Sequence, residues 1–212
     1  MEKFYLSLEI VGTVAFSVSG VITAINKKLD FFGAVVLGLM TAVGGGIFRD
    51  MILGYLPPET FRKPTQLLIS ICVSVTSFII TWICGKKVTN HIEDFSPVIN
   101  IFDSVGLSVF TVAGVNAAHN CGFSENGYLA VFVGVMTAVG GGVLRDIMVS
   151  DIPMILRKRV YALASLVGAL VYQLLLEYTS TPHYIAVIVC LILIFSIRIL
   201  ATIFKWNLPV VK

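Results

Sequence analysis

Two copies of an eleven-residue block hold the residues of this chain that could do chemistry. Residues 40–50 and 136–146 differ only by exchanges among apolar side chains, and a match of this length indicates an internal repeat. Three glycines that free backbone carbonyls, followed by a charged pair, suit the passage of an ion. The candidate residues are Gly44, Gly45, Gly46, Arg49 and Asp50 in one block and Gly140, Gly141, Gly142, Arg145 and Asp146 in the other.

The composition places both blocks in a membrane protein. The chain of 212 residues is 57% hydrophobic and 13% charged, with a mean hydropathy of +0.94. Soluble domains are about 25% charged. A net charge of +3 is too small to predict nucleic-acid binding, and basic residues beside apolar runs fit lipid headgroups. No nucleophile–base pair, metal-ligand cluster or nucleotide loop is visible, so we expect no enzyme, metal site or cofactor.

Seven apolar stretches are long enough to cross a bilayer, which takes about 20 residues. They leave no room for a separate soluble domain, so we expect one all-α transmembrane domain over residues 1–212. The predicted helices are Leu6–Ile25, Phe31–Leu53, Thr65–Cys84, Ile99–Ala118, Tyr128–Val149, Val160–Leu176 and Tyr184–Phe204.

The first six predicted helices form two copies of one three-helix unit. Gly12, Phe16 and Gly20 recur 94 positions on, and after a two-residue insertion the offset becomes 96. The copies span about 6–84 and 99–176, and the seventh helix, about 184–204, has no counterpart. An odd number of helices per copy forces the second to enter the membrane from the opposite side, which predicts an inverted 3+3 repeat plus one helix.

The triple glycines lie in the middle of predicted helices two and five. Three glycines cost a helix about 3 kcal/mol relative to alanine, an upper estimate for a bilayer. We expect each helix to break there, because irregular backbone at membrane depth is tolerated where it lines a watery cavity. The alternative is close helix packing, which small residues permit.

The Arg-Asp pairs are costly in a bilayer, at about 2.5–3.5 kcal/mol per charge. Neighbouring residues of a helix point about 100° apart, so each charge is expected to find a partner on another helix. The repeat suggests a crossed arrangement, Arg49 with Asp146 and Arg145 with Asp50. These charges would set the field in a pore or gate it; the alternative is a structural ion pair that locks the bundle.

A stripe of small and polar residues follows one face of the first and fourth predicted helices. Its members are Glu9, Thr13 and Ser17 in the first helix and Asp103 and Thr111 in the fourth. In lipid such a face contacts water or a partner helix. The two acidic residues, near opposite mouths, would attract cations or would be ordinary solvated helix ends.

Basic residues near the helix ends predict the orientation. Lys3, Arg62 and Lys63 are outnumbered on the opposite side, which places the N-terminus outside and the C-terminus in the cytoplasm. The opposite side holds Lys27, Lys28, Lys86, Lys87, Arg157, Lys158, Arg159, Lys205 and Lys212.

The doubled Gly-Gly-Gly-x-x-Arg-Asp block resembles the prokaryotic branch of the TRIC (trimeric intracellular cation) channel family. A Gly-x-x-x-Phe-x-x-x-Gly stretch precedes each block and a proline follows it, as in that family. That branch overlaps bacterial membrane proteins labelled glycine transporters. The resemblance implies a homotrimer in the plasma (inner) membrane of a prokaryote, with a K⁺ and Na⁺ pore through each subunit lined by helices two and five. Glu9 stands where the family usually has aspartate.

Three functions fit these features. The leading hypothesis is a passive channel for monovalent cations. A secondary transporter for a small amino acid such as glycine is the alternative, because inverted repeats with broken helices suit either. A lipid-binding or structural membrane protein would need no continuous polar lining.

Overall fold

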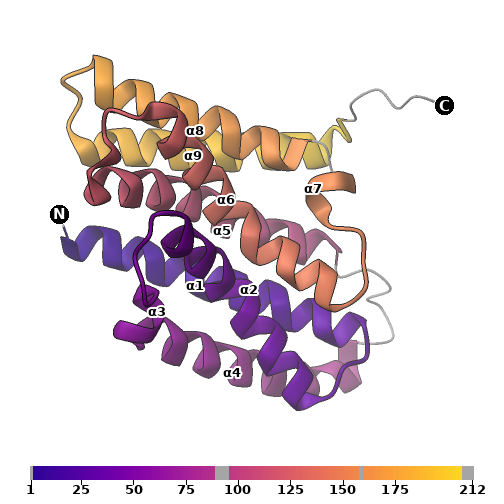
Figure 1. Cartoon of the computed structure of the whole chain (residues 1–212). Helices are drawn as coiled ribbons and strands as arrows, with labels where there is room; N and C mark the ends of the chain where they lie inside the picture. The colour runs from indigo at the N-terminus through magenta and orange to yellow at the C-terminus, as the bar shows by residue number, and fades with distance from the viewer. Residues whose placement is uncertain (1, 89–95, 158–159, 207–212) are drawn as a thin grey trace.

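The structure, a computed structural model, describes residues 2–88, 96–157 and 160–206 (Figure 1). These ranges fold into helices, with no strand among them. Seven helices have 19 residues or more. They are α1 (Glu2–Asn26), α2 (Phe31–Ile52), α4 (Thr65–Val88), α5 (Ser96–Ala118), α6 (Gly127–Met148), α8 (Val160–Tyr178) and α9 (His183–Ile203). The short elements are α3 (Glu59–Arg62), α7 (Met154–Arg157) and a π-helical turn, His119–Phe123.

All seven long helices are long and apolar enough to cross a membrane. Each coincides with a predicted span, so the prediction of an all-α polytopic membrane protein is confirmed. Three of the basic residues used to predict the orientation, Lys158, Arg159 and Lys212, lie outside the described residues.

Side-chain caps start the two helices that contain the glycine blocks. Asp30 Oδ1 accepts a hydrogen bond from the Gly33 N–H at 2.7 Å, and Asn126 Oδ1 accepts one from Leu129 N–H at 3.1 Å. Each cap satisfies an N–H group that the first turn of a helix leaves without a partner. Asp30 and Asn126 are 96 positions apart, so the two copies of the repeat start their second helix in the same way.

Helices α1, α2, α5 and α6 form the centre of the bundle, with α4 along one edge and α8 and α9 along the opposite edge (Figure 1). The rings of Phe16 and Phe110 meet in the middle, with centroids 5.2 Å apart. The edge helix α4 exposes large apolar side chains such as Ile80, Trp82 and Ile83. Lipid is the solvent that suits such a face.

The two copies of the repeat pack through equivalent contacts. A Cβ on Gly20 would lie 2.7 Å from the Cα of Gly38, and one on Gly114 would lie 2.8 Å from the Cα of Gly134. These glycines therefore let α1 approach α2, and α5 approach α6, as closely as backbones can. Equivalent helices begin at opposite ends of the bundle, with α1 starting at one end and α5 at the other (Figure 1). The insertion of the two copies from opposite sides of the membrane stays a prediction.

Candidate functional site

The glycine blocks hold α2 against α6. Both helices are continuous α-helix through their three glycines, so the predicted breaks are wrong. A Cβ on Gly45 would collide with the backbone carbonyl of Thr137, and one on Gly141 would collide with that of Thr41. The two helices cross with their backbones in contact, and only glycine fits at the crossing. Close packing, the alternative considered from the sequence, is what the structure shows.

The buried arginine of each glycine block pairs with the aspartate next to it. Arg49 Nε donates to Asp50 Oδ1 at 2.8 Å, and Arg145 Nε donates to Asp146 Oδ1 at 2.9 Å. The predicted crossed pairs are therefore wrong. The long arginine side chain folds back to reach its neighbour's carboxylate, although the two Cα–Cβ bonds point in different directions.

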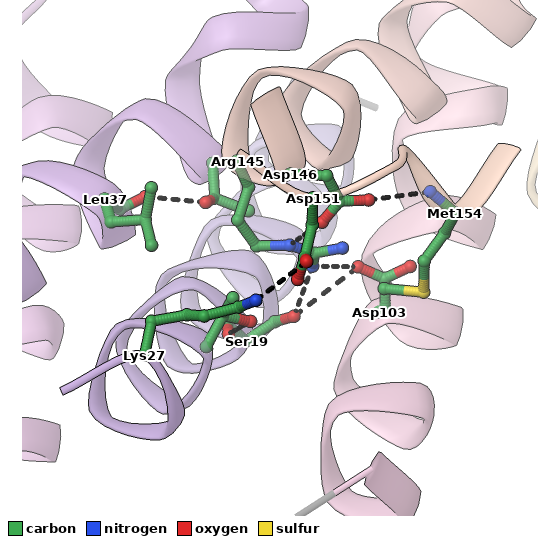
Figure 2. Close-up of polar contacts among 10 residues, drawn as sticks. Ser19, Lys27, Leu37, Asp103, Arg145, Asp146, Asp151 and Met154 are labelled. Atoms are coloured by element: carbon green, nitrogen blue, oxygen red, sulfur yellow. Dashed lines mark hydrogen bonds and ion pairs between the residues drawn. The ribbon is translucent and has the colours of Figure 1, made fainter. Parts of the chain in front are cut away.

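The second oxygen of each aspartate anchors a short helix. Asp50 Oδ2 accepts a hydrogen bond from the Glu59 N–H at 2.8 Å, where α3 begins. Asp146 Oδ2 accepts one from the Met154 N–H at 2.7 Å, where α7 begins (Figure 2). Bonds from a backbone N–H to an ionised carboxylate are stronger than neutral ones. Both aspartates thus hold the chain that leaves α2 and α6 against the bundle.

Replacing either aspartate by asparagine is expected to destabilise the protein. For Asp146→Asn the amide keeps an oxygen for the Met154 N–H, but it leaves Arg145 without its neighbouring charge. The expected cost is about 1.5–3 kcal/mol, as for other hydrogen bonds to charged groups. Thermal unfolding in detergent measures it, with Asp151→Asn as the control, since that exposed pair with Lys27 contributes about 0–1 kcal/mol. Equal stability of the two variants would contradict an anchoring role.

The polar stripe on α1 and α5 is buried between helices. Ser17 Oγ donates to Ser70 Oγ of α4 at 2.9 Å, and Thr111 Oγ1 lies 2.7 Å from Ser165 Oγ of α8. Thr13 Oγ1 donates to the carbonyl of Glu9 at 2.8 Å within its own helix. All three residues are fully buried, and the hydroxyl groups of Ser17 and Thr111 join helices, whereas that of Thr13 bonds within α1.

A buried cluster joins the two copies at the end of the bundle where α7 lies. Arg145 Nη1 donates to Asp103 Oδ1 at 2.6 Å and to Ser19 Oγ at 2.7 Å (Figure 2). Both ion-pair side chains are 0% exposed. The guanidinium of Arg198, on α9, lies 4.6 Å from the ring centroid of Tyr161. We call Ser19, Asp103, Arg145, Tyr161 and Arg198 the Asp103 cluster; it closes this end of the bundle with charges.

The opposite end is hollow. A cavity of about 700 Å³ opens between α1, α3, α4 and the ends of α5 and α9; we call it the N-terminal cavity. Its acidic residues are Glu9 and Glu59, and Gln66 Nε2 donates to Glu9 Oε2 at 2.7 Å. The full lining is Tyr5, Leu6, Glu9, Glu59, Thr60, Lys63, Thr65, Gln66, Asn116, Asn120 and His183.

The sequence did not point to several members of these two sites. Arg198 had a usable signal, because it is a charge within the most hydrophobic of the long helices. Ser19, Gln66 and Glu59 had none, since a lone hydroxyl, amide or surface acid is common at any helix. Of the predicted residues, Asp103 and Arg145 come together, and Glu9 lines the N-terminal cavity.

Comparison with known proteins assigns the family. A family model described as "Glycine transporter" matches the chain twice, at residues 6–82 and 100–177. The inner membrane protein YadS of Escherichia coli, one of the UPF0126 proteins, is 37% identical over 95% of this chain and 92% of its own length. A UPF0126 protein of Deinococcus radiodurans is 34% identical over 84% of this chain and 76% of its own length.

Solved structures extend the likeness to three dimensions. The TRIC orthologue from Rhodobacter sphaeroides has a TM-score of 0.85 at 30% identity, covering 96% of this chain and 99% of that one. A prokaryotic TRIC channel crystallised in 0.5 M KCl has a TM-score of 0.83 at 33% identity, covering 98% and 100%. The chain belongs to the prokaryotic TRIC family. The glycine-transporter model and the UPF0126 membrane proteins overlap this family, as the sequence predicts.

Proposed function

We propose that this TRIC family member is a channel for monovalent cations, K⁺ and also Na⁺, with a pathway through each subunit of a homotrimer. The N-terminal cavity carries the proposal. Its two carboxylates, Glu9 and Glu59, give it one negative charge more than its single lysine, Lys63, offsets. A cleft with an excess of one sign of charge concentrates ions of the opposite sign.

The pathway we propose runs from the N-terminal cavity along α1 toward the Asp103 cluster. Buried hydroxyl groups follow this route, beginning with Thr13 and Ser17. The triple glycines bring α2 and α6 into contact beside this route. The proposed pathway does not need those helices to break. Relatives described as cation channels share the fold over nearly the whole chain, which agrees with this function.

We place the protein in the inner membrane of a prokaryote, with the N-terminus outside and the C-terminus in the cytoplasm. A relative described as an inner membrane protein and the asymmetry of basic residues support this placement. In this orientation the N-terminal cavity is the outer mouth, and the Asp103 cluster lies near the cytoplasm. Membrane lipids surround the trimer.

A secondary transporter for glycine is the second candidate, favoured by the description of the matching family model. Helix ends and buried charges can hold a carboxylate or a cation, so the fold suits either function.

Proteoliposomes separate the two functions. Purified protein is reconstituted, and the passive flux of K⁺ is measured beside the uptake of radiolabelled glycine. The channel predicts K⁺ flux that does not depend on glycine and no accumulation of glycine. Glycine uptake without a separate K⁺ flux would replace the channel by the carrier, and neither activity would leave a structural or lipid-binding protein.

A further inference from the structure

Two equivalent acid–arginine positions of the repeat are in different states. Asp103 and Glu9 are 94 positions apart, and each lies about two turns into its helix, α5 or α1. Asp103 binds Arg145 directly, at 2.6 Å. Within the described part of the chain no ion pair joins Glu9 to Arg49, the equivalent arginine. Arg49 instead lies 3.9 Å from Glu59.

The third helices of the two copies, α4 and α8, present different side chains to the equivalent acids, Glu9 and Asp103. Ser70 and Ser165 make the equivalent contacts to the polar stripe, so the two helices align at an offset of 95 positions. At this offset Gln66 corresponds to Tyr161. Gln66 holds Glu9 at 2.7 Å. The Tyr161 hydroxyl has no hydrogen-bond partner in the described protein, so it does not hold the acid of the second copy away from its arginine.

The first helices of the two copies, α1 and α5, differ in what they offer the arginine. Ser19 Oγ accepts a hydrogen bond from Arg145. The residue 94 positions on is Ala113, which has no hydroxyl group for Arg49. Both differences therefore favour an acid bound to its arginine in the second copy (Asp103–Arg145) and an acid apart from its arginine in the first (Glu9–Arg49). We call these the closed pair and the open pair.

The closed pair contains polar atoms that the described protein does not satisfy. Asp103 Oδ2, Arg145 Nη2 and the Tyr161 hydroxyl are buried without a hydrogen-bond partner there. Gly142 borders this space, since a Cβ on it would lie 3.0 Å from the Tyr161 hydroxyl. Buried polar groups without partners are rare in proteins. Opening the pair would let water or a cation satisfy these three groups.

We propose that the pairs Glu9–Arg49 and Asp103–Arg145 are two gates at opposite ends of one pathway, and that ions pass while both gates are open. The structure has the Asp103–Arg145 gate shut and the Glu9–Arg49 gate open to the N-terminal cavity. The first gate shuts when Glu9 leaves Gln66 for Arg49, and the second gate opens when Asp103 leaves Arg145. This inference rests on the proposed channel and on the inverted repeat, and it assigns Gln66 as the residue that keeps the first gate open.

The variant Gln66→Leu tests the inference, because leucine is similar in size to glutamine but cannot donate a hydrogen bond to Glu9. Without its amide partner, Glu9 is free to bind Arg49 and close the first gate. The expected result is a Tl⁺ flux into proteoliposomes about tenfold lower than that of the wild type, which corresponds to about 1.4 kcal/mol in the gate equilibrium. Asp103→Asn, which weakens the second gate, is expected to raise the flux several-fold.

The double variant Gln66→Leu/Glu9→Gln is the decisive control. A glutamine at position 9 cannot form the ion pair, so the flux is expected to rise from the Gln66→Leu level to that of Glu9→Gln alone. If Gln66 only lines the cavity, the double variant stays at or below Gln66→Leu. Size-exclusion profiles check assembly. Gln66 is half-buried at the cavity, so Gln66→Leu is expected to assemble even if Asp103→Asn does not.

The outcomes separate the gates from the channel itself. If the wild type conducts and neither Gln66→Leu nor Asp103→Asn changes the flux, the proposed gates are wrong and the proposed channel is still supported. No Tl⁺ or K⁺ flux in the wild type or in Asp103→Asn would overturn the proposed channel, and the gates with it.

Discussion

Gly45→Ala is expected to destabilise the protein strongly, and Gly141→Ala is expected to do the same. At each position the new Cβ would collide with a backbone carbonyl on the other helix, that of Thr137 or Thr41. A backbone carbonyl cannot move aside as a flexible side chain can. The expected cost is about 3 kcal/mol, the upper end of the usual range for overpacking. Thermal unfolding in detergent, read beside the recovery of assembled protein on size-exclusion chromatography, measures it.

Gly46→Ala is the matched control for this prediction. It lies next to Gly45 in the same helix, but apart from its own turn of helix no atom lies within 4 Å of the Cβ position. Because alanine is a better helix former by about 1 kcal/mol, the control is expected to be neutral or slightly stabilising. If all three alanine variants were equally stable, the close crossing of α2 and α6 would be refuted.

Arg145→Met is the second substitution with a large expected effect. It removes the charge that faces Asp103 and Asp146, and it leaves both buried carboxylates without their arginine. Breaking a buried pair in this way costs about 3–5 kcal/mol. At about 2–4 °C per kcal/mol for a chain of this size, the unfolding midpoint should fall by about 10 °C.

The control for Arg145→Met is Lys27→Met. Lys27 forms an exposed pair with Asp151 on the same end of the bundle, so its loss is expected to cost about 0–1 kcal/mol. A midpoint for Arg145→Met within a degree of this control would show that the Asp103 cluster contributes nothing to stability.

The sequence predicted the seven helices and the equivalence of the two copies. A bilayer requires long apolar runs, and these are visible in any chain. The doubled block made the repeat plain, since Gly20 and Gly114 occupy equivalent places and make equivalent contacts. The caps at Asp30 and Asn126 follow the same offset as the blocks. These features depend on local sequence or on matching within the chain.

The role of the triple glycines could not be predicted from the sequence. Adjacent glycines serve either a break or a close crossing, and the choice depends on what faces them. The carbonyls of Thr137 and Thr41 face Gly45 and Gly141, each from the other copy. That contact joins residues about a hundred positions apart. The expectation of a break gave too much weight to the helix propensity of glycine, which matters less where packing decides.

The predicted crossed pairs were wrong for a related reason, although Arg145 does find a partner on another helix, Asp103 of α5. Helix geometry fixes the directions of the Cα–Cβ bonds, but an arginine side chain is long enough to turn back to the next residue. The chain after each block also supplies partners. The N–H groups of Glu59 and Met154 take the second oxygen of Asp50 and Asp146. Four-residue helices carry too little pattern to be predicted, so this anchoring role was invisible.

A reversal-potential measurement tests the central claim, passive conduction of monovalent cations, most directly. Purified protein is placed in a planar bilayer between two KCl solutions that differ tenfold in concentration. A cation channel predicts a current that reverses near the K⁺ equilibrium potential, about 59 mV for a monovalent ion and a tenfold ratio. A reversal at zero, a reversal of the opposite sign, or a bilayer that gains no conductance would contradict the channel.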